Sequence, residues 1–391
     1  MSVRTESELF DLAVIGAGPA GSSAAHAAAS RGLRVVLVDR APFPRYKTCG
    51  GGLIGPTLQA LPAGVVPVEQ DITRASFTLR GGNHRKKSAP RTILRLVNRS
   101  AFDYWLADRA EAAGAEFFAS RRVTGVWETG DMVNVASDRG TIRARSVIAA
   151  DGTSSRTARD VGVTMSRVDL GLELELEAPK EGSRWLDRVH LDWGPIPGSY
   201  AWVFPKGDTL TVGVIARRGQ PEAAKRYLHD FVVQMGLHRC RVLRDSGHLT
   251  RSRSIDSPIG SGRILLAGDA AGFLEPWTRE GISFAVRSGR LAAVSIADSM
   301  AAGGSPKEAL GQYQNAVATS LVVEMQAGEL CLRAFERHPG VFHRLISGTR
   351  VGWHEFSRLT RGDTTLASAM NHRSVRYSIA RLGGTHETSR P

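Results

Sequence analysis

The sequence predicts an α/β fold: a Rossmann-like nucleotide-binding domain with a βαβ unit, a second, mostly antiparallel β-sheet domain, and a helical C-terminal part. Three observations support this prediction. An apolar run, a glycine-rich turn and an alanine-rich run follow one another over residues 12–29, leucine and glutamate alternate over residues 172–177, and the last 100 residues have a helical pattern. A chain of 391 residues can hold two or three domains with sizeable cores.

The glycine-rich turn is the strongest of these signals. Gly16, Gly18 and Gly21 have the G-x-G-x-x-G spacing between a predicted strand and a predicted helix. The first glycine permits a tight turn, the second lets the backbone approach a pyrophosphate, and the third lets the helix pack closely on the strand. Unpaired N–H groups at the start of the helix then attract the phosphates. The next predicted strand, residues 35–38, ends at Asp39, where such folds bind a ribose hydroxyl, so we expect a bound dinucleotide.

The composition is that of a globular protein with an unusual charge. Hydrophobic residues make up 42% of the chain and charged residues 23%, while the net charge is +13. This charge suits a phosphate-bearing ligand or an anionic membrane surface. Nucleic acid is the competing interpretation, but we find no nucleic-acid-binding motif and expect no nucleic-acid partner. No apolar run reaches 18 residues, so we expect no membrane-spanning helix.

The three cysteines bear on the cellular compartment. Cys49, Cys240 and Cys331 are too few and too scattered for a disulfide framework or a zinc site, so we expect no metal. A reducing cytoplasm is the expected location, with peripheral attachment to a membrane as the alternative. The first predicted strand begins within about ten residues of the N-terminus, so no signal peptide is expected.

The segment 42–52 contains two prolines and three consecutive glycines, which predicts a loop that presses its backbone against a flat ligand. Its sequence P-R-Y-K-T-C-G-G resembles the P-x-x-Y-K-x-C-G-G signature of the geranylgeranyl reductase family of FAD-dependent oxidoreductases, in the para-hydroxybenzoate hydroxylase-like group. The resemblance implies an FAD cofactor. It also implies that Cys49, Gly50 and Gly51 approach the flavin and that Cys49 assists catalysis. A buried structural cysteine is the alternative interpretation.

Three further segments resemble motifs of the same family, in the same order. Arg99 opens an R-x-x-F-D helix start, and the resemblance implies that it reaches the cofactor. Asp151 and Gly152 follow a predicted strand as an A-D-G turn that supports the cofactor side of the sheet. Residues 263–272 resemble the second FAD fingerprint, in which Asp269 bonds the ribityl and phosphate region.

The helix that starts after this fingerprint is expected to point its N-terminus at the flavin pyrimidine edge, where its dipole stabilises negative charge on the reduced ring. Together these motifs give the candidate cofactor-binding residues Gly16, Gly18, Ala20, Gly21, Asp39, Arg40, Cys49, Gly50, Gly51, Arg99, Val123, Asp151, Gly152, Gly268, Asp269, Gly281 and Ile282. One position departs from the family pattern, because Arg279 stands where members often have glycine. A long cation there can narrow the flavin site or pair with a substrate acid.

The second domain is predicted from its strand patterns. The alternation over residues 172–177 indicates a half-exposed strand. Residues 200–214 predict a hairpin that turns at 206–208 and resembles the family's Y-x-W-x-F-P-K-G hairpin. The resemblance implies that Tyr200, Trp202 and Phe204 face the substrate, together with Trp277, and we assign Tyr200 and Trp202 with Cys49 to the candidate catalytic set. Ordinary core packing of the aromatic stripe is the alternative.

For two basic segments the sequence permits two roles each. The run 84–87 is predicted as the tip of a hairpin over residues 75–95, either solvated or in contact with a lipid phosphate. Basic residues lie beside aromatic ones over residues 341–361, which suits helices on an anionic membrane or helices packed on the substrate domain. The predicted domains are a discontinuous FAD-binding domain (8–75, 96–158 and 258–300), a sheet domain (76–95 and 159–257) and a helical region (301–391).

The resemblance implies reduction of carbon–carbon double bonds in an isoprenoid chain of geranylgeranyl type, by hydride from reduced flavin in a dry site. A flavin monooxygenase or halogenase acting on a small aromatic metabolite is the alternative, although Tyr200 and Phe204 replace two residues of the halogenase W-x-W-x-I-P element. A non-catalytic lipid-binding flavoprotein is a third possibility. We find no second strong nucleotide fingerprint, so the electron donor is either NAD(P)H or a ferredoxin.

Overall fold

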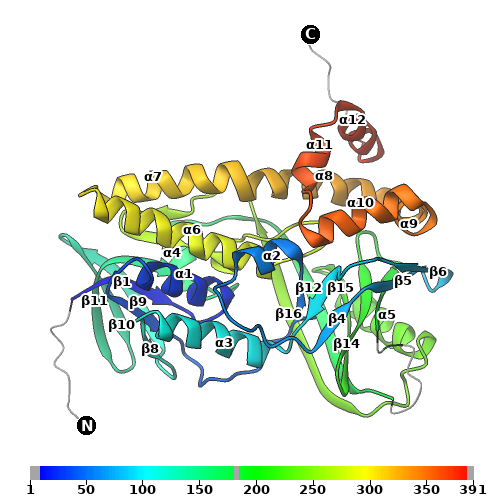
Figure 1. Cartoon of the computed structure of the whole chain (residues 1–391), viewed down its shortest axis with the longest axis horizontal. Helices are drawn as coiled ribbons and strands as arrows, with labels where there is room; N and C mark the ends of the chain where they lie inside the picture. Colours follow the sequence, from blue (N-terminus) through cyan, green and yellow to red (C-terminus); the bar gives the residue numbers. More distant parts are fainter. Residues whose placement is uncertain (1–8, 180–184, 186, 385–391) are drawn as a thin grey trace.

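The computed structural model describes residues 9–179, 185 and 187–384. In Figure 1 an eight-stranded sheet lies at one end of the molecule, a seven-stranded sheet lies at the other, and long helices extend along one side of both. This arrangement confirms the predicted fold class. The predicted domain boundaries stay a prediction, and residue 8 and residues 385–391 at the ends of two of them lie outside the described residues.

The eight-stranded sheet forms the centre of the nucleotide-binding half. Its main path runs β17-β18-β11-β1-β2-β8; β10 pairs with β11, and β9 pairs with β10. The four central pairings along this path are parallel, and Val14 of β1 lies between Leu37 and Ile148. The strands are β1 (Leu9–Ile15), β2 (Val35–Val38), β8 (Glu116–Phe118), β9 (Val123–Thr129), β10 (Met132–Ser137), β11 (Gly140–Ala149), β17 (Gly260–Ser261) and β18 (Ile264–Leu266).

Helices α1 (Pro19–Ala29) and α6 (Ile282–Ala301) pack on this sheet with very little space between them. A side chain at Gly21 would place its Cβ 1.7 Å from the carbonyl oxygen of Gly16, and one at Gly289 would place its Cβ 2.0 Å from the carbonyl oxygen of Ala20. Both contacts are possible only for glycine. The remaining helices of this half are α3 (Arg99–Ala112), α4 (Arg156–Val161), the 3₁₀ turn η1 (Gly268–Ala270) and α7 (Pro306–Val317).

The seven-stranded sheet has the order β16-β12-β15-β14-β13-β5-β6 and is antiparallel except for the β13–β5 pair. Helix α5 (Pro221–Gln234) covers one of its faces. The strands are β5 (Arg74–Leu79), β6 (Gly82–Ser88), β12 (Met165–Glu177), β13 (Arg188–Trp193), β14 (Tyr200–Lys206), β15 (Thr209–Arg217) and β16 (Val242–Arg253). A small third sheet and a short helix join the two halves: β3 (Gly52–Leu53), α2 (Gly55–Ala60), β4 (Gln70–Ile72) and β7 (Leu94–Leu96).

Two sequence predictions for this half are wrong in detail. The basic run 84–87 is part of the edge strand β6 and not a hairpin tip, because the turn comes earlier, at Arg80 and Gly81, whose φ angles are 52° and 75°. Residues 94–96 pair in the small third sheet and do not close that hairpin. The glutamates of β12 are also not uniformly exposed, since Glu173 is only 2% exposed.

The C-terminal helices cover the second face of the seven-stranded sheet. Trp353 is buried against Phe77, and its indole N–H donates to the carbonyl oxygen of Ser88 at 2.8 Å. This face of the helices therefore packs on the substrate half of the molecule. The helices are α8 (Val323–Arg337), preceded by the π-helical turn η2 (Ala318–Val322), then α9 (Pro339–Gly348), α10 (Arg350–Arg361), α11 (Leu366–Met370) and α12 (Arg373–Leu382). Within the described residues, every helix is too short or too polar to cross a bilayer.

The close contact between α1 and β1 at Gly21 gives a testable prediction. We expect Gly21→Ala to lower the free energy of unfolding by roughly 1–3 kcal/mol and to reduce FAD content, because the added methyl group overlaps the Gly16 carbonyl oxygen. Gly311→Ala in α7 is the matched control, since a Cβ there has no neighbour within 4 Å. Thermal unfolding and flavin absorbance of the purified variants measure both effects. Equal stability of the two variants would contradict the packing argument.

Candidate active site

A cavity of about 1090 Å³ is bounded by both large sheets, the loop 45–52, the start of α6 and the end of α10. Nearly all residues singled out from the sequence line it. Gly21 and Gly268 lie behind its wall, where they allow close packing; a Cβ at Gly268 would be 2.8 Å from that of Ala20. The predicted residues that line the cavity are Gly16, Gly18, Ala20, Asp39, Arg40, Cys49, Gly50, Gly51, Arg99, Val123, Asp151, Gly152, Tyr200, Trp202, Phe204, Asp269, Trp277, Gly281 and Ile282.

The start of α1 has the features of a pyrophosphate site. Gly18 is the N-cap of α1, and neither a capping side chain nor an acidic residue occupies its first turn. The N–H groups there remain available to an anion. At the end of β2, the Asp39 carboxylate accepts hydrogen bonds from the backbone N–H groups of Ala17 and Ala41, both at 2.8 Å. Since an ionised carboxylate has about four acceptor positions, Asp39 can still accept from a ribose hydroxyl.

Arg99 is held in the cavity wall by a buried carboxylate. Its guanidinium donates to both oxygens of Asp103, at 2.8 and 3.0 Å, and Arg45 approaches the same carboxylate at 3.2 Å. Burial lowers the pKa of Arg99, but the charges of Asp103 and Cys49 and the hydrogen bonds to both residues together raise it above its usual value. Sequence reasoning singled out Arg99 and missed Asp103 and Arg45. The i, i+4 spacing of Arg99 and Asp103 on a helix was the available signal.

A second charged group lies around the predicted Asp269. His248 Nε2 is 3.9 Å from Asp269 Oδ2, and Lys47 Nζ lies 2.9 Å from the same His248 nitrogen. Burial lowers the pKa of Lys47 to about 8. Burial would raise the pKa of Asp269, but hydrogen bonding to His248 and the charge of Lys47 hold it below its usual range. Neither Lys47 nor His248 was predicted as a site residue.

The start of α6 repeats the arrangement at α1. Gly281 is the N-cap, without a capping side chain, and Ile282 begins the helix. The Glu280 carboxylate accepts from the Ser283 N–H at 2.8 Å, and burial raises the pKa of Glu280 to about 7. The positive end of the α6 dipole therefore faces the cavity with at most partial compensation at neutral pH.

An aromatic wall faces the loop that carries Cys49. Tyr200, Trp202 and Phe204 lie on one face of β14, with successive ring centroids 6.0 and 6.3 Å apart. The loop lies directly on this wall, since a Cβ at Gly50 would be 3.1 Å from the Phe204 ring. Burial raises the pKa of Tyr200, and its hydroxyl donates to the carbonyl oxygen of Thr278 at 2.5 Å. The exposed surface of this side of the cavity is mostly aromatic.

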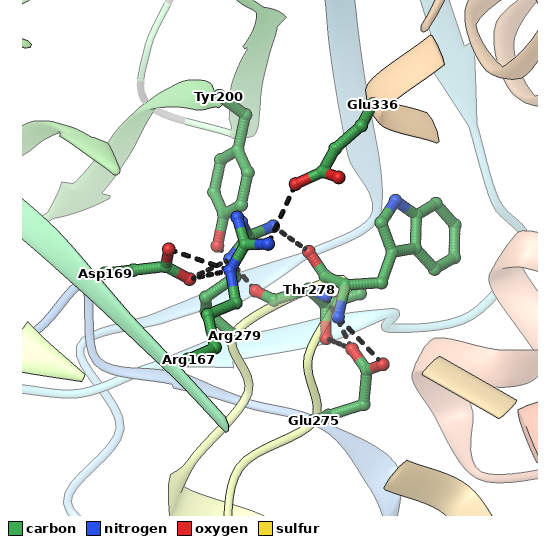
Figure 2. A network of polar contacts seen from close by, with 8 residues as sticks. Arg167, Asp169, Tyr200, Glu275, Thr278, Arg279 and Glu336 are labelled. Carbon is green, nitrogen blue, oxygen red and sulfur yellow. Dashed lines mark hydrogen bonds and ion pairs between the residues drawn. The ribbon is translucent and has the colours of Figure 1, made fainter. Parts of the chain in front are cut away.

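Arg279 is bound by a carboxylate of the protein, that of Asp169 (Figure 2). Its Nε lies 3.1 Å from Asp169, which also accepts from Arg167 at 2.9 Å, and Arg167 continues the network to Glu336 of α8 at 2.8 Å. The backbone of Arg279 has φ of 57°, in the left-handed region that favours glycine. Its Nη2 is buried and, within the described part of the chain, has no hydrogen-bond partner. Pairing of Arg279 with a substrate acid stays a prediction.

The comparisons with known proteins agree with this geometry. Residues 10–176 match the FAD binding domain family. The chain is 31% identical to geranylgeranyl diphosphate reductase of Rhodobacter capsulatus over 298 residues, which is 73% of this chain and 74% of the relative. It is also 31% identical to digeranylgeranylglycerophospholipid reductase 1 of Methanopyrus kandleri over 331 residues, 78% of this chain and 85% of the relative. The chain belongs to the geranylgeranyl reductase family of FAD-dependent oxidoreductases.

Solved structures support the same fold for this family member. A geranylgeranyl bacteriochlorophyll reductase-like protein of Thermoplasma acidophilum has a TM-score of 0.76 and 21% identity, with 96% of each chain covered. A flavin-dependent brominase has the same TM-score at 19% identity, covering 96% of this chain and all of the other. At these identities the likeness establishes the fold alone. FAD is the cofactor, and the glycine turn, Asp39 and the two helix N-termini have the chemistry to hold it.

The network around Arg279 yields a stability prediction. We expect Arg279→Met to lower the free energy of unfolding by about 3 kcal/mol, because the change leaves Asp169 buried with one of its two cations removed. Arg358→Met is the matched control: the Arg358–Glu355 pair is exposed, so its loss costs less than about 1 kcal/mol. Urea unfolding of the two variants measures the difference. A smaller effect at Arg279 than at Arg358 would show that the network does not hold the loop.

Proposed function

We propose that this reductase-family protein adds hydrogen across carbon–carbon double bonds of an isoprenoid chain, with NAD(P)H or a ferredoxin as the electron donor. The observation that carries the proposal is the apolar wall of Tyr200, Trp202 and Phe204 facing the Cys49 loop inside the same cavity as the FAD-binding residues. An unactivated alkene offers no polar handle, so a site for it must align the chain by shape and keep water out. The relatives named as geranylgeranyl and digeranylgeranylglycerophospholipid reductases support this substrate class.

Reduced FAD supplies hydride when it is bound, and the protein must supply the rest. One alkene carbon receives the hydride and the other receives a proton. We assign that proton to the thiol of Cys49, which lies in the loop between the aromatic wall and the nucleotide-binding residues. The aromatic side chains hold the alkene, and Trp277, buried against Phe335 and Phe342, closes the apolar end of the site.

The activity itself is the first test. The FAD-bound protein, reduced with dithionite and incubated with geranylgeranyl diphosphate or a geranylgeranyl lipid, is expected to yield products heavier by two hydrogens for each reduced bond. We expect Cys49→Ala to keep its flavin absorbance and to lose reduction by roughly 100-fold or more, as removal of a general acid does. Cys240→Ala is the control, because Cys240 packs beside the cluster under α5, away from the cavity. Products with an added oxygen or halogen would identify the monooxygenase or halogenase alternative.

We also propose that an exposed patch beside α10 contacts an anionic membrane. Leu345 and Val351 are 49% and 74% exposed, and Arg344 and Arg350 lie next to them. Lys87 of β6 donates to the carbonyl oxygen of Thr349 at 3.4 Å, so the basic edge strand borders the same patch. Helix α10 runs from this patch to the cavity, which its residues Phe356 and Leu359 line. A lipid chain could therefore pass along α10 from the bilayer to the site.

Vesicle binding tests the patch. We expect Arg344→Glu/Arg350→Glu to weaken binding to phosphatidylglycerol vesicles by roughly tenfold or more, since each basic residue near an anionic surface contributes about 1 kcal/mol. Arg226→Glu on α5 is the control, because α5 covers the opposite face of the seven-stranded sheet. Co-sedimentation at low and high salt measures the effect. Equal losses for both variants would indicate attraction by net charge without a defined patch.

A further inference from the structure

Two buried charged side chains lie against the peptide of Cys49. Glu173 comes from β12 and Lys206 from the end of β14, the two strands that flank β15. They are 2% and 4% exposed. Both were missed in the sequence, where Glu173 was read as one of several exposed glutamates and Lys206 as part of a turn. Isolated charges are rarely buried this deeply without a function.

The strand register brings Glu173 and the aromatic wall onto one face of the sheet. Glu173 lies opposite Gly213 of β15, and Gly213 lies opposite Trp202 of β14. A side chain at Gly213 would place its Cβ 2.2 Å from the indole ring of Trp202, so the ring fills the space over this glycine. Lys206 is four residues after Trp202 on the same strand and therefore on the same face.

Glu173 and Lys206 bind the backbone N–H and the backbone carbonyl group of Cys49, respectively. Glu173 Oε1 accepts from the backbone N–H of Cys49 at 3.1 Å, and Lys206 Nζ donates to the Cys49 carbonyl oxygen at 3.3 Å. The ammonium group also occupies the space beside Gly51, where an added Cβ would be 3.1 Å from Nζ. Because burial of a charged group costs free energy, the placement of both side chains against the backbone of the candidate residue points to a positioning role.

The charges of Glu173 and Lys206 depend on pH. Burial raises the pKa of Glu173 to about 7, against the opposing charge of Lys206 and the hydrogen bond from Cys49. Glu175 on the same strand raises that pKa further, Arg99 of α3 lowers it, and Tyr46 of the loop faces the same carboxyl. Burial lowers the pKa of Lys206. Glu173 Oε2 is buried and, among the described residues, has no hydrogen-bond partner.

We propose that Glu173 and Lys206 are positioning residues for Cys49, and that ionisation of Glu173 controls how readily the Cys49 thiol reacts. This inference rests on the proposed function only in giving Cys49 a catalytic role. When Glu173 is neutral, the loop is held by a neutral hydrogen bond, and the cations of Lys206 and Arg99 leave the surroundings of the Cys49 sulfur positively charged, which favours its reaction. When Glu173 ionises, its negative charge cancels that effect and makes the thiol less reactive.

Alkylation of Cys49 by iodoacetamide in the FAD-bound protein tests the proposal without any isoprenoid. Mass spectrometry of the Cys49 peptide gives its rate, and Cys240 and Cys331, both free thiols, serve as references within the same molecule. Glu173→Gln keeps an acceptor for the Cys49 N–H but cannot ionise. We expect this variant to react at the wild-type rate at pH 6 and at least about threefold faster than wild type at pH 8.

A second variant tests the role of Lys206. Lys206→Met removes the cation, so we expect Cys49 to react at least about threefold more slowly than in wild type at pH 6, with Cys240 unchanged. A variant-to-wild-type ratio for Glu173→Gln that is the same at both pH values, or a parallel change at Cys240, would overturn the proposal. Should Glu173→Gln fail to fold, the Lys206→Met rate decides alone. The reduction assay of Cys49→Ala tests the proposed function separately.

Discussion

The close approach of α1 to β1 at Gly21 is the constraint on which the cavity depends. A methyl group there would overlap the Gly16 carbonyl oxygen, and Gly289 makes the same demand where α6 crosses α1. Because both helices pack closely at positions that lack side chains, their N-termini at Gly18 and Gly281 reach one cavity. Two partial positive charges then point into one cavity, and such charges suit the anionic pyrophosphate and the reducible ring of FAD.

The buried charges around this cavity are arranged in pairs that join different parts of the chain. Arg45 from the loop joins Asp103 of α3, Glu173 of β12 joins the loop at Cys49, and Asp169 of β12 joins the segment before α6. Such pairs cost desolvation and add little net stability, but they fix orientation because each has directional hydrogen bonds. They surround an aromatic wall whose one directional side-chain bond, among the described residues, runs from the Tyr200 hydroxyl to the Thr278 carbonyl oxygen. The electrostatic frame therefore provides the geometry that hydrocarbon contacts alone cannot provide.

The sequence was sufficient wherever a local rule determines the structure. The glycine spacing predicted the turn at Gly16, and the residues from Tyr200 to Phe204 predicted a strand with one aromatic face. The Glu173 side chain could not be placed in the same way, because the strand pattern tells which face it occupies but not that the Cys49 loop covers that face. The basic run 84–87 was assigned to a tip because charge suggested a loop, whereas an edge strand tolerates charge equally well. A local sequence pattern does not tell whether a segment far away in the chain will bury a given side chain.

Arg279 shows how a contact with a residue far away in the sequence keeps a residue in an unfavourable backbone conformation. A left-handed backbone at a residue other than glycine costs roughly 1–3 kcal/mol, and a glycine at position 279 would avoid that cost. The chain keeps the arginine because its guanidinium reaches Asp169, which Arg167 links to Glu336 of α8. The shape of the segment before α6 thus depends on a C-terminal helix far away in the sequence. The packing of α8, which leads into the helices that carry the exposed basic patch, therefore bears on the shape of the cavity at the segment before α6.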